Sequence, residues 1–252
     1  MTRRPRETSE AGFYHVIVRG NGKQLLFDDD TDRDAFLALL TRFLDGSGVR
    51  VLAWCLMDNH VHLCLAEDPE TGLDEISRIM RVVQTEYAKR FNGRTGHVGH
   101  IFQARFASMP INDERYLLQA VRYIHNNPQK ANICPADRYR WSSYSEYLGA
   151  PGLCDTEPVL EALGGVDGFI EFSHVQDDDG YRFRYGRHVD DADLSAVASN
   201  VLGGMDPRQL KTLPKAERDS RLRDLRAAGV TIDQTVRLTG IGRTTVANAT
   251  RR

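Results

Sequence analysis

The segment from residue 51 to residue 66 constrains the fold more than any other part of the chain, because two apolar runs flank a short polar break. The runs VLAWCLM and VHLCLA are rich in residues that favour strands, and Asp58-Asn59-His60 between them is typical of a turn. Two strands joined by so short a turn pair antiparallel. The sequence therefore predicts a β-hairpin and, with it, an antiparallel sheet.

Segments on both sides of this hairpin predict two more strands and three helices. The strands are expected at 12–18 and 102–111, and the helices at 30–44, at 73–91 and from 112 or 113 to 126, where Pro128 stops the last one. The order β-α-β-β-α-β-α predicts an α+β domain with a ferredoxin-like antiparallel sheet and helices on one face. Several other α+β sheets share this order.

Composition narrows the class of protein. The 252 residues are 41% hydrophobic and 27% charged, as in an ordinary globular protein. We find no apolar run of the ~18 residues that span a membrane, and no apolar stretch after the N-terminal arginines. We therefore expect a cytoplasmic protein without a membrane partner. The four cysteines are far apart in the sequence and are expected to be reduced thiols.

The net charge of −2 conceals three blocks of different sign. Residues 76–105 carry six basic side chains and one acidic side chain. Residues 151–210 carry four basic and twelve acidic side chains, and residues 211–252 carry ten basic and four acidic side chains. Two basic blocks indicate contacts with nucleic acid, although basic helix faces are often plain solvated surface. We predict a domain over 1–150, an acidic and partly helical linker over 151–210, and a second domain over 211–252.

The last of these regions has the pattern of a three-helix helix-turn-helix unit. Thr231 and Gln234 predict a capping box at the start of the second helix, and Gly240 lies in the turn before the third. A small bundle used for dimerisation would show the same periodicity. We favour DNA binding because the third helix carries side chains suited to phosphates and base edges, namely Arg243, Thr244, Thr245 and Asn248.

His60 and His62 are the sharpest local feature of the hairpin. Side chains two residues apart on a strand point to the same face, so both imidazoles project together. Two converging imidazoles form half of a divalent-metal site and need a third ligand from elsewhere. A polar pair on the solvent face of the sheet would explain the same residues equally well.

Five segments between residues 12 and 149 read, in order, FYHVIVRGNGKQLLFDDDTDRDAFL, LMDNHVHLCL, GHIFQARF, YLLQAVRYIHNNPQKAN and WSSYSEYLG. Their combination resembles the REP-associated tyrosine transposases, which belong to the single-tyrosine HUH class of DNA-nicking enzymes. The HVH pair and the RYIHNNP segment are the most specific parts of this resemblance. The acidic stretch and the C-terminal helices lie beyond it.

The resemblance implies that residues 1–150 form a ferredoxin-like catalytic domain that nicks and rejoins single-stranded DNA near a hairpin. Tyr123 corresponds to the family's nucleophile, whose attack leaves a 5′-phosphotyrosine and a free 3′-hydroxyl. His60 and His62 correspond to the histidines that hold Mg²⁺ or Mn²⁺ against the scissile phosphate.

The third metal ligand implied by related enzymes is a polar residue one helical turn after the tyrosine. Here that residue is Asn127, although Pro128 biases it away from helical geometry. Three competitors remain, namely Gln119, His125 and Asn126. Asn127 ranks first among them.

The implied nucleic-acid partner is single-stranded or hairpin DNA of the repetitive extragenic palindrome type, with duplex DNA as a second partner for the C-terminal helices. The resemblance places the loop around Arg105 near DNA. This loop, the end of the first strand and the basic face of the 73–91 helix together supply four candidate phosphate contacts: Arg19, Arg78, Arg81 and Arg105.

Two other functions fit the sequence. A domesticated, non-catalytic regulator would bind structured DNA, and a metallohydrolase or RNA-processing nuclease would use the histidine pair without a covalent step. The joint presence of His60, His62 and Tyr123 favours the transposase, because a pure binder has no need of all three. Related enzymes act as monomers or as homodimers, so both states remain open.

Overall fold

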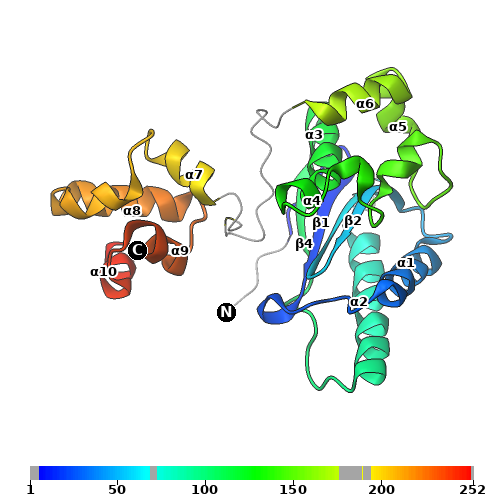
Figure 1. Ribbon diagram of the computed structural model, residues 1–252, viewed down its shortest axis with the longest axis horizontal. Coiled ribbons are helices and arrows are strands. Elements are labelled where there is room, and N and C mark those ends of the chain that lie inside the picture. Colours follow the sequence, from blue (N-terminus) through cyan, green and yellow to red (C-terminus); the bar gives the residue numbers. More distant parts are fainter. Residues whose placement is uncertain (1–5, 69–72, 176–188, 190–193, 251–252) are drawn as a thin grey trace. The chain divides into compact units, whose positions relative to one another are not determined.

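The computed structural model describes residues 6–68, 73–175, 189 and 194–250, and the chain divides into two compact units, residues 1–181 and 182–252 (Figure 1). The strands of the first unit are β1 (Phe13–Arg19), β2 (Arg50–Met57), β3 (His60–Ala66) and β4 (Ala107–Ile111). Its α-helices are α1 (Asp30–Leu44), α2 (Asp74–Thr95), α3 (Glu114–His125), α4 (Asn127–Lys130), α5 (Glu157–Leu163) and α6 (Val166–His174). Short 3₁₀ turns lie at Asn21–Lys23, Ala136–Arg138 and Ser143–Leu148.

The four strands form one sheet in the order β2-β3-β1-β4, and every neighbouring pair is antiparallel. The predicted hairpin is present as β2 and β3. Connections through α1 and α2 produce this strand order, which is the ferredoxin-like arrangement. The predicted α+β class with an antiparallel sheet is confirmed.

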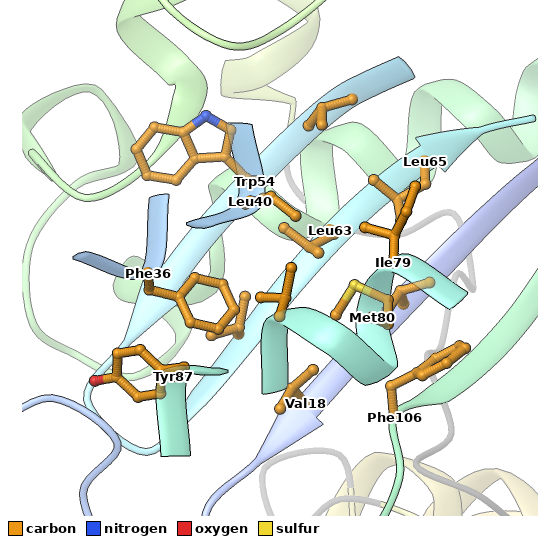
Figure 2. Packing of buried hydrophobic residues seen from close by; sticks show 14 of the residues in the cluster. Val18, Phe36, Leu40, Trp54, Leu63, Leu65, Ile79, Met80, Tyr87 and Phe106 are labelled. Carbon is orange, nitrogen blue, oxygen red and sulfur yellow. The ribbon is translucent and has the colours of Figure 1, made fainter. Parts of the chain in front are cut away.

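Helices α1 and α2 cover one face of the sheet and form the main core with it. Alternate residues of the strands point into this core, as the two-residue period of a strand requires. Figure 2 shows the meeting of the two layers, with Val18, Leu63 and Leu65 from the sheet and Phe36, Leu40, Ile79, Met80 and Tyr87 from the helices. The remaining strand residues point to the opposite face.

The opposite face is covered by α3, which corrects the expectation that the helices lie on one face only. Tyr123 of α3 packs against the rings of His15 and His62, which point away from the main core. Asp113 caps this helix by accepting a hydrogen bond from the backbone N–H of Tyr116 at 2.8 Å. An apolar stripe on a helix indicates that one side is buried, but it does not indicate which face of a sheet buries it.

The predicted strand at 102–111 is shorter in the structure, where β4 begins at Ala107. Before it, the backbone N–H of Gln103 donates to the carbonyl of Arg19 at 2.9 Å, and the later carbonyls accept from side chains. Arg6 donates to the carbonyl of Phe106 at 2.9 Å, and Gln84 donates to the carbonyl of Ala104 at 3.4 Å. Residues 102–106 therefore form a loop beside α2.

The predicted linker over 151–210 does not form a separate region in the part of the chain that the structure describes. Helices α5 and α6 belong to the first unit, where Phe169 stacks on Tyr147 with ring centroids 4.4 Å apart. Helix α7 (Leu194–Val201) belongs to the second unit, where Leu194 and Ala198 are buried in its core. The few apolar side chains in this acidic stretch decide where each helix packs.

The second unit is a small helical bundle around its own apolar core. After α7 it contains a 3₁₀ segment (Pro207–Thr212), α8 (Lys215–Ala227), α9 (Ile232–Thr239) and α10 (Arg243–Ala249). The capping box between Thr231 and Gln234 is formed, and Gly240 ends α9 with a left-handed φ of 64°. No helix in the described part of the chain is both long and apolar enough to cross a membrane.

Candidate active site

The site is built on the face of the sheet that α3 covers. His60 and His62 project from β3 on this face, and their ring centroids are 4.9 Å apart. Strand β1 lies beside β3 in a register that places Arg19 opposite His60 and Ile17 opposite His62. Residues that pair directly across a sheet share a face, so Arg19 starts from the same face as the two imidazoles.

Helix α3 brings Tyr123 to these imidazoles. The tyrosine ring lies 5.8 Å from the ring of His62, centroid to centroid, and meets it edge-on. Only 7% of Tyr123 is exposed, so most of the ring is held between α3 and the sheet. The structure thus brings together three residues predicted from the HVH and RYIHNNP segments, although Tyr123 is 63 and 61 positions from His60 and His62 in the chain.

Asn127 joins the same cluster through the short helix α4. Its side-chain amide nitrogen donates to the carbonyl of Tyr123 at 3.0 Å, and its Oδ1 therefore faces Nε2 of His60, at 3.5 Å. Pro128 lies in the first turn of α4, a position that needs no backbone N–H, so helical geometry resumes at Asn127. The expectation that Pro128 biases Asn127 away from helical geometry is wrong for this reason.

The competitors for the third ligand position are arranged differently. His125 points to the other side of α3, where its Nε2 lies 2.8 Å from Oγ of Ser143 and its ring packs against Phe169. Of the four candidates, Asn127 is the residue whose oxygen faces a histidine of the pair. Among the described residues, no three His, Cys, Asp or Glu side chains cluster in a way that would hold a metal ion.

Two residues of the cluster were not identified from the sequence. His15 of β1 lies with its Nε2 2.9 Å from Nδ1 of His62, and Lys130 of α4 lies with its ammonium 4.1 Å from the centre of the Tyr123 ring. A lone polar residue inside the apolar strand GFYHVIV was the available signal for His15. For Lys130 the signal was its position seven residues after Tyr123, on the same helical side.

The electrostatic setting keeps the buried imidazoles uncharged near neutral pH. Burial lowers the pKa of His62 well below its usual value, and electrostatic interactions with His60, His15, Arg19 and Lys130 lower it further. Burial also lowers the pKa of His15 to about 3. A neutral imidazole has a lone pair for a metal ion, so His62 needs to lose no proton before it acts as a ligand.

A groove of about 950 Å³ runs between α2 and the loop at 99–106 and is lined by basic side chains. Arg81 and Arg105 line it, are exposed, and make no ion pair with any other described residue. Arg78 also lines it, but its guanidinium donates to both carboxylate oxygens of Glu75. Three of the four predicted arginines therefore line the groove, whereas Arg19 is not among its lining residues. The groove reaches Phe102, whose backbone pairs with Gly20, the residue after Arg19.

In the second unit, the four predicted DNA-contact residues lie on the surface of α10. Arg243, Thr244, Thr245 and Asn248 are all exposed, whereas Val246 on the same helix is fully buried. Arg243 forms an ion pair with Asp233 of α9. The turn at Gly240 separates α9 from α10, so the exposed polar side of α10 begins directly after this turn.

Comparisons with known proteins find similarity to transposases. The sequence model of the IS200-like transposases matches residues 8–127. Among solved structures, a REP-associated tyrosine transposase bound to a REP hairpin is 17% identical with a TM-score of 0.49, over 62% of this chain and 94% of its own. A putative transposase from Deinococcus radiodurans R1 is 18% identical with a TM-score of 0.34, and the match covers 50% of this chain and 95% of the transposase chain. No curated protein matches the chain.

The fold and the cluster define an α+β protein that presents paired imidazoles and a tyrosine on one face of an antiparallel sheet. Residues 8–127, which are 120 of the 252 residues, are similar to the IS200-like transposases. The matched segment ends at Asn127 and so includes every residue of the cluster except Lys130.

Proposed function

We propose that the protein is a metal-dependent tyrosine transposase that nicks and rejoins single-stranded, hairpin-bearing DNA. The observation that carries the proposal is the placement of the Tyr123 ring against His62 while the Asn127 oxygen faces His60. A regulator that only binds DNA has no use for a tyrosine next to two imidazoles. The REP-type hairpin is the substrate that the sequence resemblance implies.

The residues present fit a divalent cation. Asn59 Oδ1 lies 2.7 Å from Nδ1 of His60 and can only accept a hydrogen bond there, so Nε2 of His60 carries the lone pair. This lone pair then faces another acceptor, the Asn127 oxygen, at 3.5 Å. Two ligands that each lie about 2.1 Å from one cation are separated by roughly 3.0–3.5 Å. Such a pairing of acceptors is expected where a cation belongs.

In this proposal His60, His62 and Asn127 hold Mg²⁺ or Mn²⁺. When bound, the cation would offset the negative charge that develops on the oxygens of the scissile phosphate. Nitrogen and amide ligands leave the site without a protein carboxylate, so its positive charge is not reduced. This matters because the substrate phosphodiester is itself an anion.

The chemical step is assigned to Tyr123. Its phenolic oxygen forms a bond to phosphorus, and the bond between phosphorus and the 3′ oxygen breaks. The phenol gives up its proton and the departing oxygen gains one, which leaves a 5′-phosphotyrosine and a 3′-hydroxyl. Because the new bond is again a phosphodiester, attack by a 3′-hydroxyl reverses the step and rejoins the strand.

Lys130 and Arg19 supply positive charge to the same place. The Lys130 ammonium lies over the Tyr123 ring, and both cations contribute, after burial, to the lowered pKa of His62. We assign them to the phosphate that Tyr123 attacks. Arg81 and Arg105, in the groove beside α2, are assigned to the phosphates of the adjoining strand.

The second unit is assigned to duplex DNA. Its α9–turn–α10 arrangement exposes side chains of the types that contact phosphates and base edges. Such binding would hold the enzyme on the double-stranded DNA that flanks a hairpin.

The proposal is tested with labelled single-stranded DNA that carries hairpins from the repeats near the gene. We expect a denaturant-resistant protein–DNA adduct in Mg²⁺ or Mn²⁺, and none in EDTA or with Tyr123→Phe. Tyr116→Phe is the matched control, because Tyr116 lies on the same helix and is 51% exposed. If the protein binds the DNA but forms no adduct with either Mg²⁺ or Mn²⁺, the proposal is contradicted and a DNA-binding regulator is favoured. Metal-dependent cleavage by Tyr123→Phe would favour a metallonuclease.

A further inference from the structure

We propose that His15 is a positioning residue that fixes the tautomer of His62 and so directs the Nε2 lone pair of His62 to the metal. The inference rests on the proposed function, because it concerns the metal site assigned there. It adds a third histidine that is not itself a ligand.

The sheet register brings the two rings together. His15 pairs with Cys64 across β1 and β3, while His62 pairs with Ile17, so the two histidines are diagonal neighbours on one face. Aromatic side chains reach one another across this diagonal. Here the two nitrogens, Nε2 of His15 and Nδ1 of His62, are 2.9 Å apart, and both side chains are buried.

At hydrogen-bond distance, one of the two nitrogens carries a proton and donates it, and the other accepts. A histidine that binds a metal through Nε2 must carry its proton on Nδ1. His62 then donates from Nδ1 to Nε2 of His15, and His15 in turn carries its own proton on Nδ1. The reverse arrangement, in which His15 donates, would also allow the 2.9 Å contact but would place the His62 proton on Nε2, where the metal belongs.

Metal-binding histidines commonly donate their second ring N–H to a carboxylate or a backbone carbonyl. In this protein a buried imidazole takes that place. A carboxylate there would add a negative charge close to the scissile phosphate, whereas a neutral imidazole orients His62 without one. The edge of the Tyr123 ring, 5.7 Å from the His15 ring between centroids, confines the His15 ring from α3.

The direct test is the tautomer of His62 in the metal-free protein, read from the ring ¹⁵N chemical shifts by long-range ¹H–¹⁵N NMR. We expect the wild type to carry the His62 proton on Nδ1. His15→Phe keeps a ring but offers no acceptor, so it should shift His62 toward the Nε2–H form. His15→Gln places an amide oxygen near the position of Nε2 and should restore the Nδ1–H form.

A second measurement is the affinity for Mn²⁺, followed by titration calorimetry. We expect His15→Phe to weaken binding about 10- to 100-fold, as losing a hydrogen-bonded partner of a ligand does, and His15→Gln to bind within a few-fold of the wild type. Thermal unfolding shows whether each variant is folded. If His15→Phe does not fold, His15→Asn replaces it, because its shorter amide does not reach Nδ1 of His62.

The proposal is overturned if wild-type His62 carries its proton on Nε2, or if removal of the acceptor leaves both the tautomer and the Mn²⁺ affinity unchanged. The proposed function fails in a different way. In that case the NMR result follows our expectation, but the wild type forms no covalent adduct with DNA.

Discussion

At the scale of single residues, Asn127 connects Tyr123, the proposed nucleophile, to the histidine pair. Its amide nitrogen is bonded to the backbone of Tyr123, and its oxygen faces His60. The orientation of the amide is fixed by the carbonyl of Tyr123, which can only accept. The same side chain therefore sets the position of a proposed metal ligand relative to the proposed nucleophile.

Replacement of Asn127 by Ala is expected to weaken Mn²⁺ binding by a factor on the order of tenfold or more, since one proposed ligand is lost. Asn126→Ala is the matched control, because Asn126 is the neighbouring residue of the same type and lines a pocket with Pro135 and Tyr144. Titration calorimetry on both variants measures the difference. Equal affinities for the two variants would show that the third ligand is another residue.

The residues of the site differ in how far the sequence could predict them. His60 and His62 were accessible because two residues on one strand share a face whatever the tertiary structure. Tyr123 and Asn127 were accessible only through the family resemblance. The role of His15 depends on the register between β1 and β3, and no local pattern in GFYHVIV specifies that register.

At the scale of secondary-structure elements, α2 contributes an apolar side to the core and a basic side to the groove. The basic residues of this helix are not equivalent. Arg78 is bound to Glu75 on the preceding helical turn, whereas Arg81 makes no ion pair within the described residues. The charge of the sequence segment alone does not distinguish them, because it does not show which pairs form.

We expect Arg81→Gln and Arg105→Gln each to reduce the salt dependence of single-strand binding. The slope of log K against log salt should fall by about 0.7 for every phosphate contact removed. Arg78→Gln, the control, should change the slope less because this guanidinium is already paired with Glu75. Fluorescence anisotropy at several salt concentrations measures the slopes. A larger change for Arg78→Gln than for the other two would contradict the assignment of the groove.

Helix α6 is the element whose place was missed most clearly. Its periodicity is weak, and its sequence lies in the acidic stretch, but Phe169 is 1% exposed and packs on both His125 and Tyr147. It therefore supports α3 from the side opposite to the cluster. The sequence predicted the hairpin and the two crossover helices well because their patterns are long and local, whereas this contact joins residues 44 positions apart.

Phe169→Ala should lower the free energy of unfolding of the first unit by about 3–5 kcal/mol, as removal of a buried aromatic ring does. Val166→Ala on the same helix is the control, because Val166 is 40% exposed. Denaturant unfolding followed by fluorescence compares the two. A loss below about 1 kcal/mol for Phe169→Ala would show that α6 does not pack on α3 in solution.

At the scale of the whole molecule, buried histidines make folding depend on pH. His15 and His125 are fully buried, and burial lowers the pKa of each to about 3. Below a pH of about 6.5 the unfolded chain binds protons at these positions while the folded chain does not. The stabilisation is therefore complete above about pH 6.5 and is lost as the pH falls toward 3.

Urea unfolding between pH 6.5 and pH 5 is expected to show a free energy of unfolding that decreases with acidification. Each of the two histidines contributes up to about 1.4 kcal/mol per pH unit. His125→Gln should reduce the slope by the share of one histidine, because a glutamine does not titrate. A free energy that is constant or rises over this range would contradict the buried, neutral state of these side chains.

The division into two units also belongs to this scale. The first unit holds the tyrosine cluster and the basic groove, and the second holds the exposed polar side of α10. Opposite charges in the sequence predicted separate regions, but the apolar residues of α5, α6 and α7 set the boundary in the structure. Charge describes the surface of a unit, whereas burial decides which helices belong to it.

The central claim, that Tyr123 attacks the DNA backbone, is tested most directly by mapping the covalent adduct. Wild-type protein is incubated with Mn²⁺ and a hairpin-bearing single strand labelled at either end, and the adduct is digested and sequenced by mass spectrometry. We predict that the nucleotide remains on the peptide that contains Tyr123, that the 3′ label stays with the protein, and that the 5′ label is released on a strand ending in a 3′-hydroxyl. An adduct on Tyr116 or another residue, or retention of the 5′ label, would contradict the account.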